Sequence, residues 1–128
     1  MRIFCSKRCR MLYQPFLALP LSPTDAAYLA AFIDGEGSII ALKRLDGSVK
    51  SFRIMISNTY KPALDWCQLV TGLGSVNQRT LATKSPNHKA CYSWEAYGVK
   101  AASVLTQIIP FMQIKKEKAQ AALEIMRP

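Results

Sequence analysis

The first regular segment of this chain is a nearly continuous apolar stretch over residues 23–33. Ser22 can cap it and Pro23 suits its first turn, which predicts a helix that is buried on nearly every side. The sequence Asp34-Gly35-Glu36-Gly37 should end this helix, because glycine adopts the backbone angles of a helix terminus. Two carboxylates therefore come at the end of the helix where the helix dipole disfavours negative charge.

An antiparallel hairpin is predicted directly after this helix. Residues 38–45 and 49–57 are rich in strand-forming side chains, and Asp46-Gly47 between them is a strong turn signal. Apolar and polar side chains alternate along the second strand, so we expect one of its faces in the core and the other exposed. The core-facing residues are expected to be Phe52, Ile54 and Ile56.

The next segment, residues 61–71, has a helical spacing of apolar side chains and is followed by two glycines that favour a helix end. Its inward side chains are predicted to be Leu64, Cys67 and Leu69. A second strand pair at residues 75–79 and 90–97, a helix that ends before Pro110 and a last helix over residues 114–126 complete the chain. The order helix, hairpin, helix, hairpin, helix, helix predicts an α+β fold with an antiparallel sheet.

Composition adds a preference for a polyanionic partner. The 128 residues carry 17 Lys and Arg against 8 Asp and Glu, a formal net charge of +9 that suits nucleic acid. No apolar run approaches the ~20 residues of a membrane span, so we expect a soluble intracellular protein, in the cytoplasm, the nucleoid or an organelle, with no membrane partner. Residues 1–20 are basic and contain no acid, which predicts a poorly ordered arm before a single domain over residues 21–128.

The two acids after the first helix are the strongest candidates for chemistry. A divalent cation would offset their unfavourable position, because hard ions such as Mg²⁺ bind carboxylate and carbonyl oxygens. Alternatively, Asp34 and Glu36 are solvated loop acids that follow a core helix. The residues alone leave both interpretations open.

The segment Tyr28–Ile39 resembles the signature motif of the LAGLIDADG homing endonucleases, with Ala31 where glycine is usual and Glu36 where Asp or Glu is found. A later stretch, Pro110–Ala119, is similar to the segment that opens the last helix in single-motif members, and the order of elements matches over residues 22–126. The resemblance implies an αββαββα fold with a curved antiparallel DNA-binding sheet. It also implies a site-specific endonuclease of intron or intein homing that cuts both strands of a long pseudo-palindromic duplex.

The resemblance further implies the residues of the catalytic site. Glu36 and the carbonyl of Gly35 would bind Mg²⁺ or another divalent cation, and no small-molecule cofactor is expected. Metal ions and a nearby ammonium group can serve the nucleophilic water, the phosphoryl charge and the leaving oxygen of phosphodiester hydrolysis. The other catalytic positions are a polar residue ending the second strand and two basic residues, namely Asn58 (or Ser57), Lys115 and Lys61 (or Pro62 in a shifted alignment).

The motif occurs once, whereas a double-strand break needs two active sites, so we expect a homodimer on double-stranded DNA. Small side chains on the first helix would let two copies approach closely. Alternatively, these side chains pack against the helix's own domain. The predicted interface residues are Ala27, Ala30, Ala31 and Asp34.

The polar faces of the strands are candidate base-reading surfaces, because a two-stranded ribbon fits the major groove. For each side chain, contact with phosphate or simple exposure is an equal alternative. The candidates on strands are Arg44, Ser51, Arg53, Met55, Ser57, Asn77, Arg79 and Ser93. In the long loop, Lys84 and Lys89 are predicted to meet phosphates.

Two rival functions stay open at this level. A non-cleaving LAGLIDADG-type nucleic-acid-binding protein, such as an intron splicing helper (maturase), would keep the sheet and the charge but tolerate loss of the Glu36 chemistry. A basic α+β interaction domain without a nucleic-acid role would lack a steep salt dependence of duplex binding. The presence of both Glu36 and Lys115 favours the enzyme.

Overall fold

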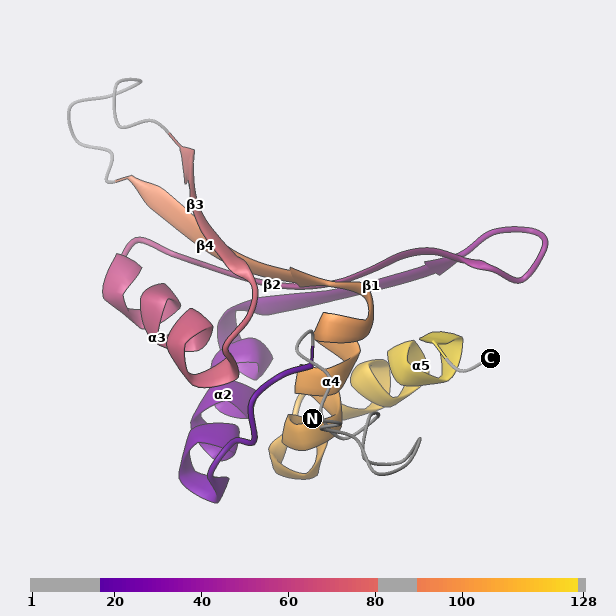
Figure 1. Cartoon of the computed structure of the whole chain (residues 1–128), viewed down its shortest axis with the longest axis horizontal. Coiled ribbons are helices and arrows are strands. Elements are labelled where there is room, and N and C mark those ends of the chain that lie inside the picture. The colour runs from indigo at the N-terminus through magenta and orange to yellow at the C-terminus, as the bar shows by residue number, and fades with distance from the viewer. Residues whose placement is uncertain (1–16, 81–89, 127–128) are drawn as a thin grey trace, which may run out of the picture.

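The computed structural model describes residues 17–80 and 90–126. Within them, four α-helices lie on one face of a four-stranded sheet, and the opposite face is uncovered (Figure 1). None of the described helices combines the length and the apolar character needed to cross a membrane. Most of the predicted N-terminal arm, together with Lys84 and Lys89, lies outside the described residues.

Helix α2 spans Pro23–Glu36, and the Ser22 side chain caps it by accepting a hydrogen bond from the backbone N–H of Asp25 at 3.1 Å. The helix runs three residues past its predicted end, to Glu36. The expected reason for its last glycine is wrong, because Gly37 has a φ of −95° that any residue adopts. Glycine is needed there for space: a Cβ at Gly37 would lie 2.8 Å from the Cα of Ile33.

The sheet is antiparallel throughout and has the strand order β1-β2-β4-β3. Its two hairpins therefore meet along β2 and β4, and both ends of the sheet curve away from the helices (Figure 1). The predicted α+β fold with a curved antiparallel sheet is confirmed. The strands are β1 (Gly37–Lys43), β2 (Val49–Asn58), β3 (Ser75–Thr80) and β4 (Cys91–Tyr97).

The remaining helices follow the predicted order, with Pro110 inside a short 3-10 turn directly after the third helix. Leu64 and Cys67 face the core as predicted, but Leu69 is 75% exposed. Residues two positions apart point to different sides of a helix, so Leu69 could not share the face of Cys67. The helices are α3 (Lys61–Thr71), α4 (Gly98–Ile108) and α5 (Lys116–Met126), and the 3-10 turn is η2 (Ile109–Phe111).

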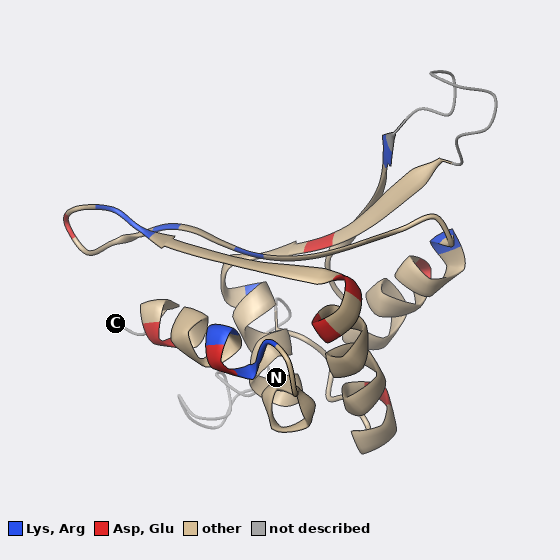
Figure 2. Ribbon diagram, turned by 180° about the vertical axis from the view of Figure 1, so that it is seen from behind, with Lys and Arg blue, Asp and Glu red and all other residues tan. Residues whose placement is uncertain are grey.

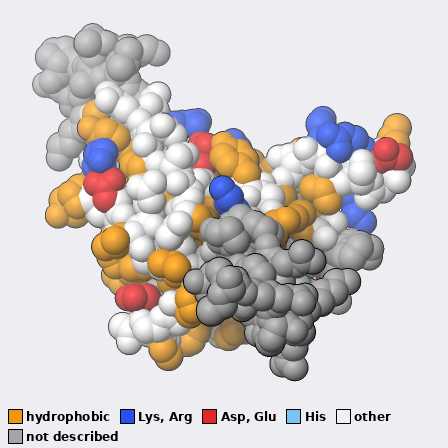
Figure 3. Space-filling model, viewed as in Figure 1, with side chains coloured by type: hydrophobic (Ala, Val, Ile, Leu, Met, Phe, Trp, Pro, Cys, Tyr) orange, Lys and Arg blue, Asp and Glu red, His pale blue; other side chains and the backbone are white. Residues whose placement is uncertain are grey.

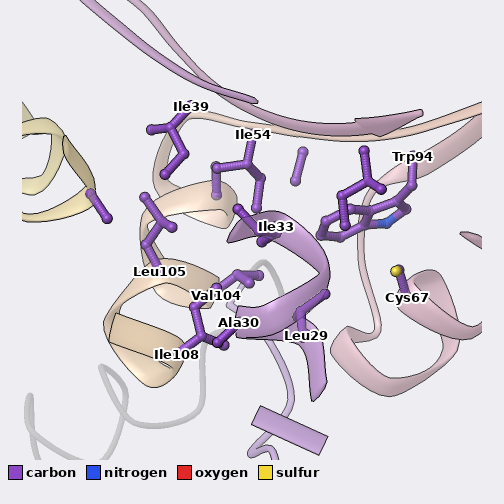
Figure 4. Close-up of a cluster of buried hydrophobic side chains, with 14 of the residues drawn as sticks. Leu29, Ala30, Ile33, Ile39, Ile54, Cys67, Trp94, Val104, Leu105 and Ile108 are labelled. Atoms are coloured by element: carbon purple, nitrogen blue, oxygen red, sulfur yellow. The ribbon is translucent and has the colours of Figure 1, made fainter. Parts of the chain in front are cut away.

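The core lies between the inner face of the sheet and the helices (Figure 4). Leu29 and Ile33 of α2 pack there with side chains of β2, β4 and α4, and Trp94 of β4 donates from Nε1 to the carbonyl of Leu73 at 3.0 Å. However, α2 is not buried on nearly every side as predicted, because Tyr28 is 60% exposed. The helix is apolar all round, but the described chain covers only part of it.

The last residues of the predicted arm are tied to the domain. The backbone N–H of Ala18 donates to Ser103 Oγ at 2.9 Å, and that of Leu19 donates to the carbonyl of Thr71 at 2.8 Å. Residues 18 and 19 thus contact α4 and α3, while the predicted boundary at residue 21 stays a prediction.

Candidate active site and nucleic-acid surface

Glu36 is the last residue of α2, and its side chain is exposed where the helix leads into the sheet. Asn58, the last residue of β2, donates from Nδ2 to Glu36 Oε2 at 3.2 Å, while its Oδ1 accepts from the backbone N–H of Tyr60 at 2.8 Å. These two partners need opposite ends of the amide, so together they determine its orientation. The structure thus joins two residues that the motif placed in one site, and Figure 2 shows the acidic end of α2 directly beneath the sheet.

Lys115 lies just before α5 and covers the end of α2. Its Nζ donates to the carbonyl oxygen of Asp34 at 2.6 Å and to that of Ile33 at 3.2 Å. The last carbonyls of a helix have no partner within the helix, and a cation beside them also interacts favourably with the helix dipole. Two of the three ammonium donors of Lys115 therefore serve the helix that carries Glu36.

Asp34 faces its own chain and is only 6% exposed, and its place in a dimer interface stays a prediction. Its Oδ2 accepts from the backbone N–H of Gln113 at 2.7 Å, and its Oδ1 accepts from that of Lys115 at 2.9 Å. Burial alone would raise the pKa of this carboxyl, but hydrogen bonds from the backbone of Gln113, Lys115 and Ile114 and the charge of Lys115 bring it below its ordinary 3.8. We call this reciprocal arrangement of Asp34 and Lys115 the α2–α5 clamp.

The exposed side of α2 carries some of the predicted interface residues but not all of them. Ala31 and Gly35 are exposed and Ala27 is half-buried, and a Cβ at Gly35 would meet nothing within 4 Å. Ala30, in contrast, is fully buried in the core of its own chain, and its interface role stays a prediction. Tyr28 borders the exposed strip and packs edge-on against Trp66, with 5.0 Å between ring centroids.

Lys61 is the first residue of α3, and its ammonium group pairs with Asp65 one turn later, with Nζ 3.0 Å from Oδ1. Both side chains are about half exposed, at 49% and 47%. The structure therefore brings Lys61 to Asp65 and not to Glu36 or Asn58.

The uncovered face of the sheet carries most of the predicted DNA-contacting side chains. Phe52, Ile54 and Ile56 are buried as predicted, so the residues that alternate with them lie on the outer face. Lys and Arg side chains also gather at the hairpin between β1 and β2 (Figure 3). The predicted residues on the outer face are Ser51, Arg53, Met55, Ser57, Asn77, Arg79 and Ser93.

Two of the residues predicted to contact DNA are engaged or buried within the chain. Arg44 donates from Nη1 to the carbonyl of Val49 at 2.7 Å and to Ser48 Oγ at 3.3 Å, so it stabilises the hairpin turn. Ser93 lies on the outer face but is fully buried, and its Oγ has no hydrogen-bond partner within the described residues. Ser93 could reach a base only if its neighbours moved, and its DNA contact stays a prediction.

Glu95 was missed by the sequence reasoning, although it lies in the middle of the same face. Its Oε1 accepts from Arg79 Nη1 at 2.9 Å, and the Tyr97 hydroxyl donates to its Oε2. The signal was available, because Glu95 alternates with the buried Trp94 and shares the parity of Ser93 along β4. Its negative charge gave no sign of a DNA contact, because phosphates repel a carboxylate.

The described side chains near Glu36 are too few to complete a metal site. Among residues 17–80 and 90–126, no three His, Cys, Asp or Glu side chains come together to hold an ion. Glu36 offers one exposed carboxylate, and Mg²⁺ accepts such oxygens together with water and phosphate. The residues of one chain therefore fit a hard cation only if further ligands are supplied from outside it, such as water or phosphate oxygens.

Neither a family model nor a curated protein matches this sequence. Solved structures do match. The homing endonuclease I-CvuI has a TM-score of 0.63 and 22% identity, over 80% of this chain and 66% of its own. The archaeal intron-encoded I-Vdi141I has a TM-score of 0.59 and 22% identity, over 80% and 67%, and the group I intron-encoded I-CeuI has 0.52 and 17%, over 83% and 55%. The chain thus spans about two thirds of the length of the first two proteins. It has the fold of the LAGLIDADG homing endonucleases, as its motif segment implied.

Proposed function

We propose that this protein is a divalent-metal-dependent, site-specific endonuclease that cuts both strands of a duplex DNA site as a homodimer, in intron- or intein-type homing. The main support is the position of Glu36, an exposed carboxylate held by Asn58 at the end of α2, beneath an uncovered sheet. The net charge of +9 suits a DNA partner. I-CvuI, I-Vdi141I and I-CeuI were each solved in complex with DNA.

Glu36 and the carbonyl of Gly35 would hold Mg²⁺ in this proposal. I-CvuI was solved with DNA in the presence of magnesium and also in the presence of calcium. Such an ion, when bound, lowers the pKa of a water and stabilises charge on the phosphoryl oxygens. The hydrogen bond from Asn58, at 3.2 Å, favours one orientation of the Glu36 carboxylate and so helps to preorganise its charge.

Lys115 and Lys61 stay predicted catalytic residues. We infer that Lys115 contributes first by holding the helix end that presents Gly35 and Glu36, because its ammonium group binds the adjacent carbonyls. Lys61 would have to leave Asp65 to meet a phosphate. That exchange is inexpensive, since exposed ion pairs contribute only about 0–1 kcal/mol.

A homodimer would supply the second Glu36 that a double-strand break requires. The exposed strip of α2 contains Ala27, Ala31 and Gly35, which are spaced by four residues and so share one side of the helix. Small side chains there would let two copies of α2 approach closely and bring both Glu36 residues near a twofold axis. A twofold protein favours a pseudo-palindromic site.

The test is to incubate the protein with a randomised duplex library and Mg²⁺, and to sequence the cut ends. We expect a recurrent sequence cut on both strands. Glu36→Gln should abolish cutting and keep duplex binding, whereas Glu117→Gln, the same change at an exposed position of α5, should cut like the wild type. Retained cutting by Glu36→Gln would remove Glu36 from the metal site.

A non-cleaving nucleic-acid-binding role, such as an intron splicing helper, is the second candidate. It is favoured by one observation, since Lys61 and Lys115 are both engaged within the chain. Duplex binding with no cut ends, unaffected by Glu36→Gln, would support it. Duplex binding with no steep salt dependence would argue against both candidates, because phosphate contacts release counterions.

A further inference from the structure

An acid in the middle of a surface proposed to face DNA requires a physical reason. Glu95 lies on the outer face of β4, with Met55 of β2 and Ser75 of β3 as its cross-strand neighbours, and it is 7% exposed. An unpaired carboxylate there would lose hydration and repel phosphates. Both of its oxygens are instead bonded, because Arg79 Nη1 donates to Oε1 at 2.9 Å and the Tyr97 hydroxyl donates to Oε2.

Arg79 owes its position to an irregularity in β3. Gln78 lies opposite Tyr92 and Thr80 lies opposite Cys91, so Arg79 is the extra residue between two rungs of the ladder. A bulge of this kind bends the strand and changes the direction of the side chain. The bulge therefore lets Arg79 reach Glu95, which pairs with a residue four positions earlier in β3.

The pair differs strongly in exposure. The Arg79 side chain is 49% exposed, whereas that of Glu95 is 9% exposed. A guanidinium group has five N–H donors in a rigid plane, and the bond to Glu95 uses one of them. The acid thus lies beneath the arginine and holds a group whose outer half faces solvent.

We propose that Arg79 reads a guanine edge in the major groove and that Glu95, braced by Tyr97, is the positioning residue that preorders it. Arginine donates to the O6 and N7 of guanine with two parallel hydrogen bonds, which requires the planar group to be correctly turned. Holding Arg79 beforehand lowers the side-chain entropy that is lost on binding. The inference rests on the proposed function, because the outer face of the sheet must meet duplex DNA.

Contact with a phosphate would explain the arrangement less well. Glu95 cancels much of the charge of Arg79, and a phosphate is attracted mainly by charge. A base edge, in contrast, is recognised by the direction of the donors, which an ion pair preserves. The ion pair thus weakens the attraction of Arg79 to phosphate but fixes the direction of its N–H donors, and recognition of a base edge depends on that direction.

The test selects duplexes from a randomised library with the full chain and compares base preferences position by position. We expect the wild type to prefer guanine at one position of each half-site. Arg79→Ala should lower that preference by roughly 5- to 150-fold, with little change elsewhere. Glu95→Gln, which keeps the shape of the side chain, should lower it at the same position, and adding Glu95→Gln to Arg79→Ala should change nothing more. Arg53→Ala is the control and should affect a different position.

Thermal unfolding of each variant checks folding. Tyr97→Phe removes only the hydroxyl of a half-exposed side chain and should give a second and smaller loss of guanine preference at the same position. A uniform loss of affinity over all sequences, with a salt slope reduced by about one, would show a phosphate contact and overturn the proposal. Unchanged preferences in Arg79→Ala or Glu95→Gln would overturn it as well. A wild type that selects no sequence would overturn the proposed function together with this inference.

Discussion

Asp34→Asn is expected to loosen the α2–α5 clamp. The Asp34 carboxylate is 6% exposed and accepts the backbone N–H groups of Gln113 at 2.7 Å and of Lys115 at 2.9 Å. Asparagine keeps the size of the side chain but replaces one acceptor oxygen with an NH2 donor. One buried backbone donor then faces another donor and loses its partner.

The expected size of the effect follows from these two bonds. A hydrogen bond to a charged group contributes about 1.5–3 kcal/mol. One such bond is lost in the variant and the other becomes neutral, so the free energy of unfolding should fall by roughly 2–4 kcal/mol. For a chain of 128 residues, this corresponds to a decrease in Tm of about 6–16 °C.

The effect should also depend on pH. Burial alone raises the pKa of Asp34, but the backbone hydrogen bonds and Lys115 outweigh it and keep the pKa below 3.8. A carboxyl whose pKa is lowered by folding adds stability that is complete above its unfolded-state pKa and is lost as the pH falls through its folded-state pKa. The difference between wild type and variant should be full near neutral pH and shrink below about pH 4.

Thermal unfolding followed by far-UV circular dichroism, from neutral to acidic pH, measures both quantities. The matched control is Asp65→Asn, because Asp65 forms an exposed ion pair with Lys61 that contributes at most about 1 kcal/mol. A Tm of Asp34→Asn equal to that of the wild type, or a difference that does not change with pH, would refute the role of this carboxylate in joining α2 to α5.

Three further predictions concern other residues. Lys115→Met should lower the free energy of unfolding by about 1–2 kcal/mol, measured by urea unfolding without DNA. Unchanged stability would show that the hydrogen bonds from Lys115 to the α2 carbonyls do not stabilise the fold. Ala31→Leu should yield monomers in sedimentation, whereas Gln120→Leu, an equally exposed change on α5, should not; an intact Ala31→Leu dimer would place the interface elsewhere. Burial raises the pKa of Cys67 to about 12, so iodoacetamide should label its peptide only after unfolding.

Local pattern was sufficient for the elements and their order. The Ser22 cap, the Asp46-Gly47 turn and the alternation along β2 depend on residues close together in the chain, so the sequence alone identified them. The order of those elements then predicted an α+β fold with an antiparallel sheet, whereas the strand order β1-β2-β4-β3 was not predicted. The prediction that Leu69 faces the core was wrong, because it used the apolar character of the side chain and not its angular position around α3.

The residues of the candidate site could be predicted only in part from the sequence. Glu36 and Asn58 stand out by their places at the ends of a helix and a strand. These ends meet because β1 begins directly after Glu36 and pairs antiparallel with β2, which brings Gly37 opposite Ile56. The direction of a bulged side chain is not encoded in alternation, so the pairing of Arg79 with Glu95, 16 residues apart, was not predicted.

The sequence by itself determined the helices, the strands, the basic charge and the acid at the end of the motif helix. Only the tertiary structure decided that Asp34 turns inward to the backbone of Lys115, 81 residues away, and that Ala30 is buried while Ala31 is exposed. The physical reason is that periodicity shows which side of an element is apolar. What covers that side, and which distant donors reach a carboxylate, depends on how all the elements pack together.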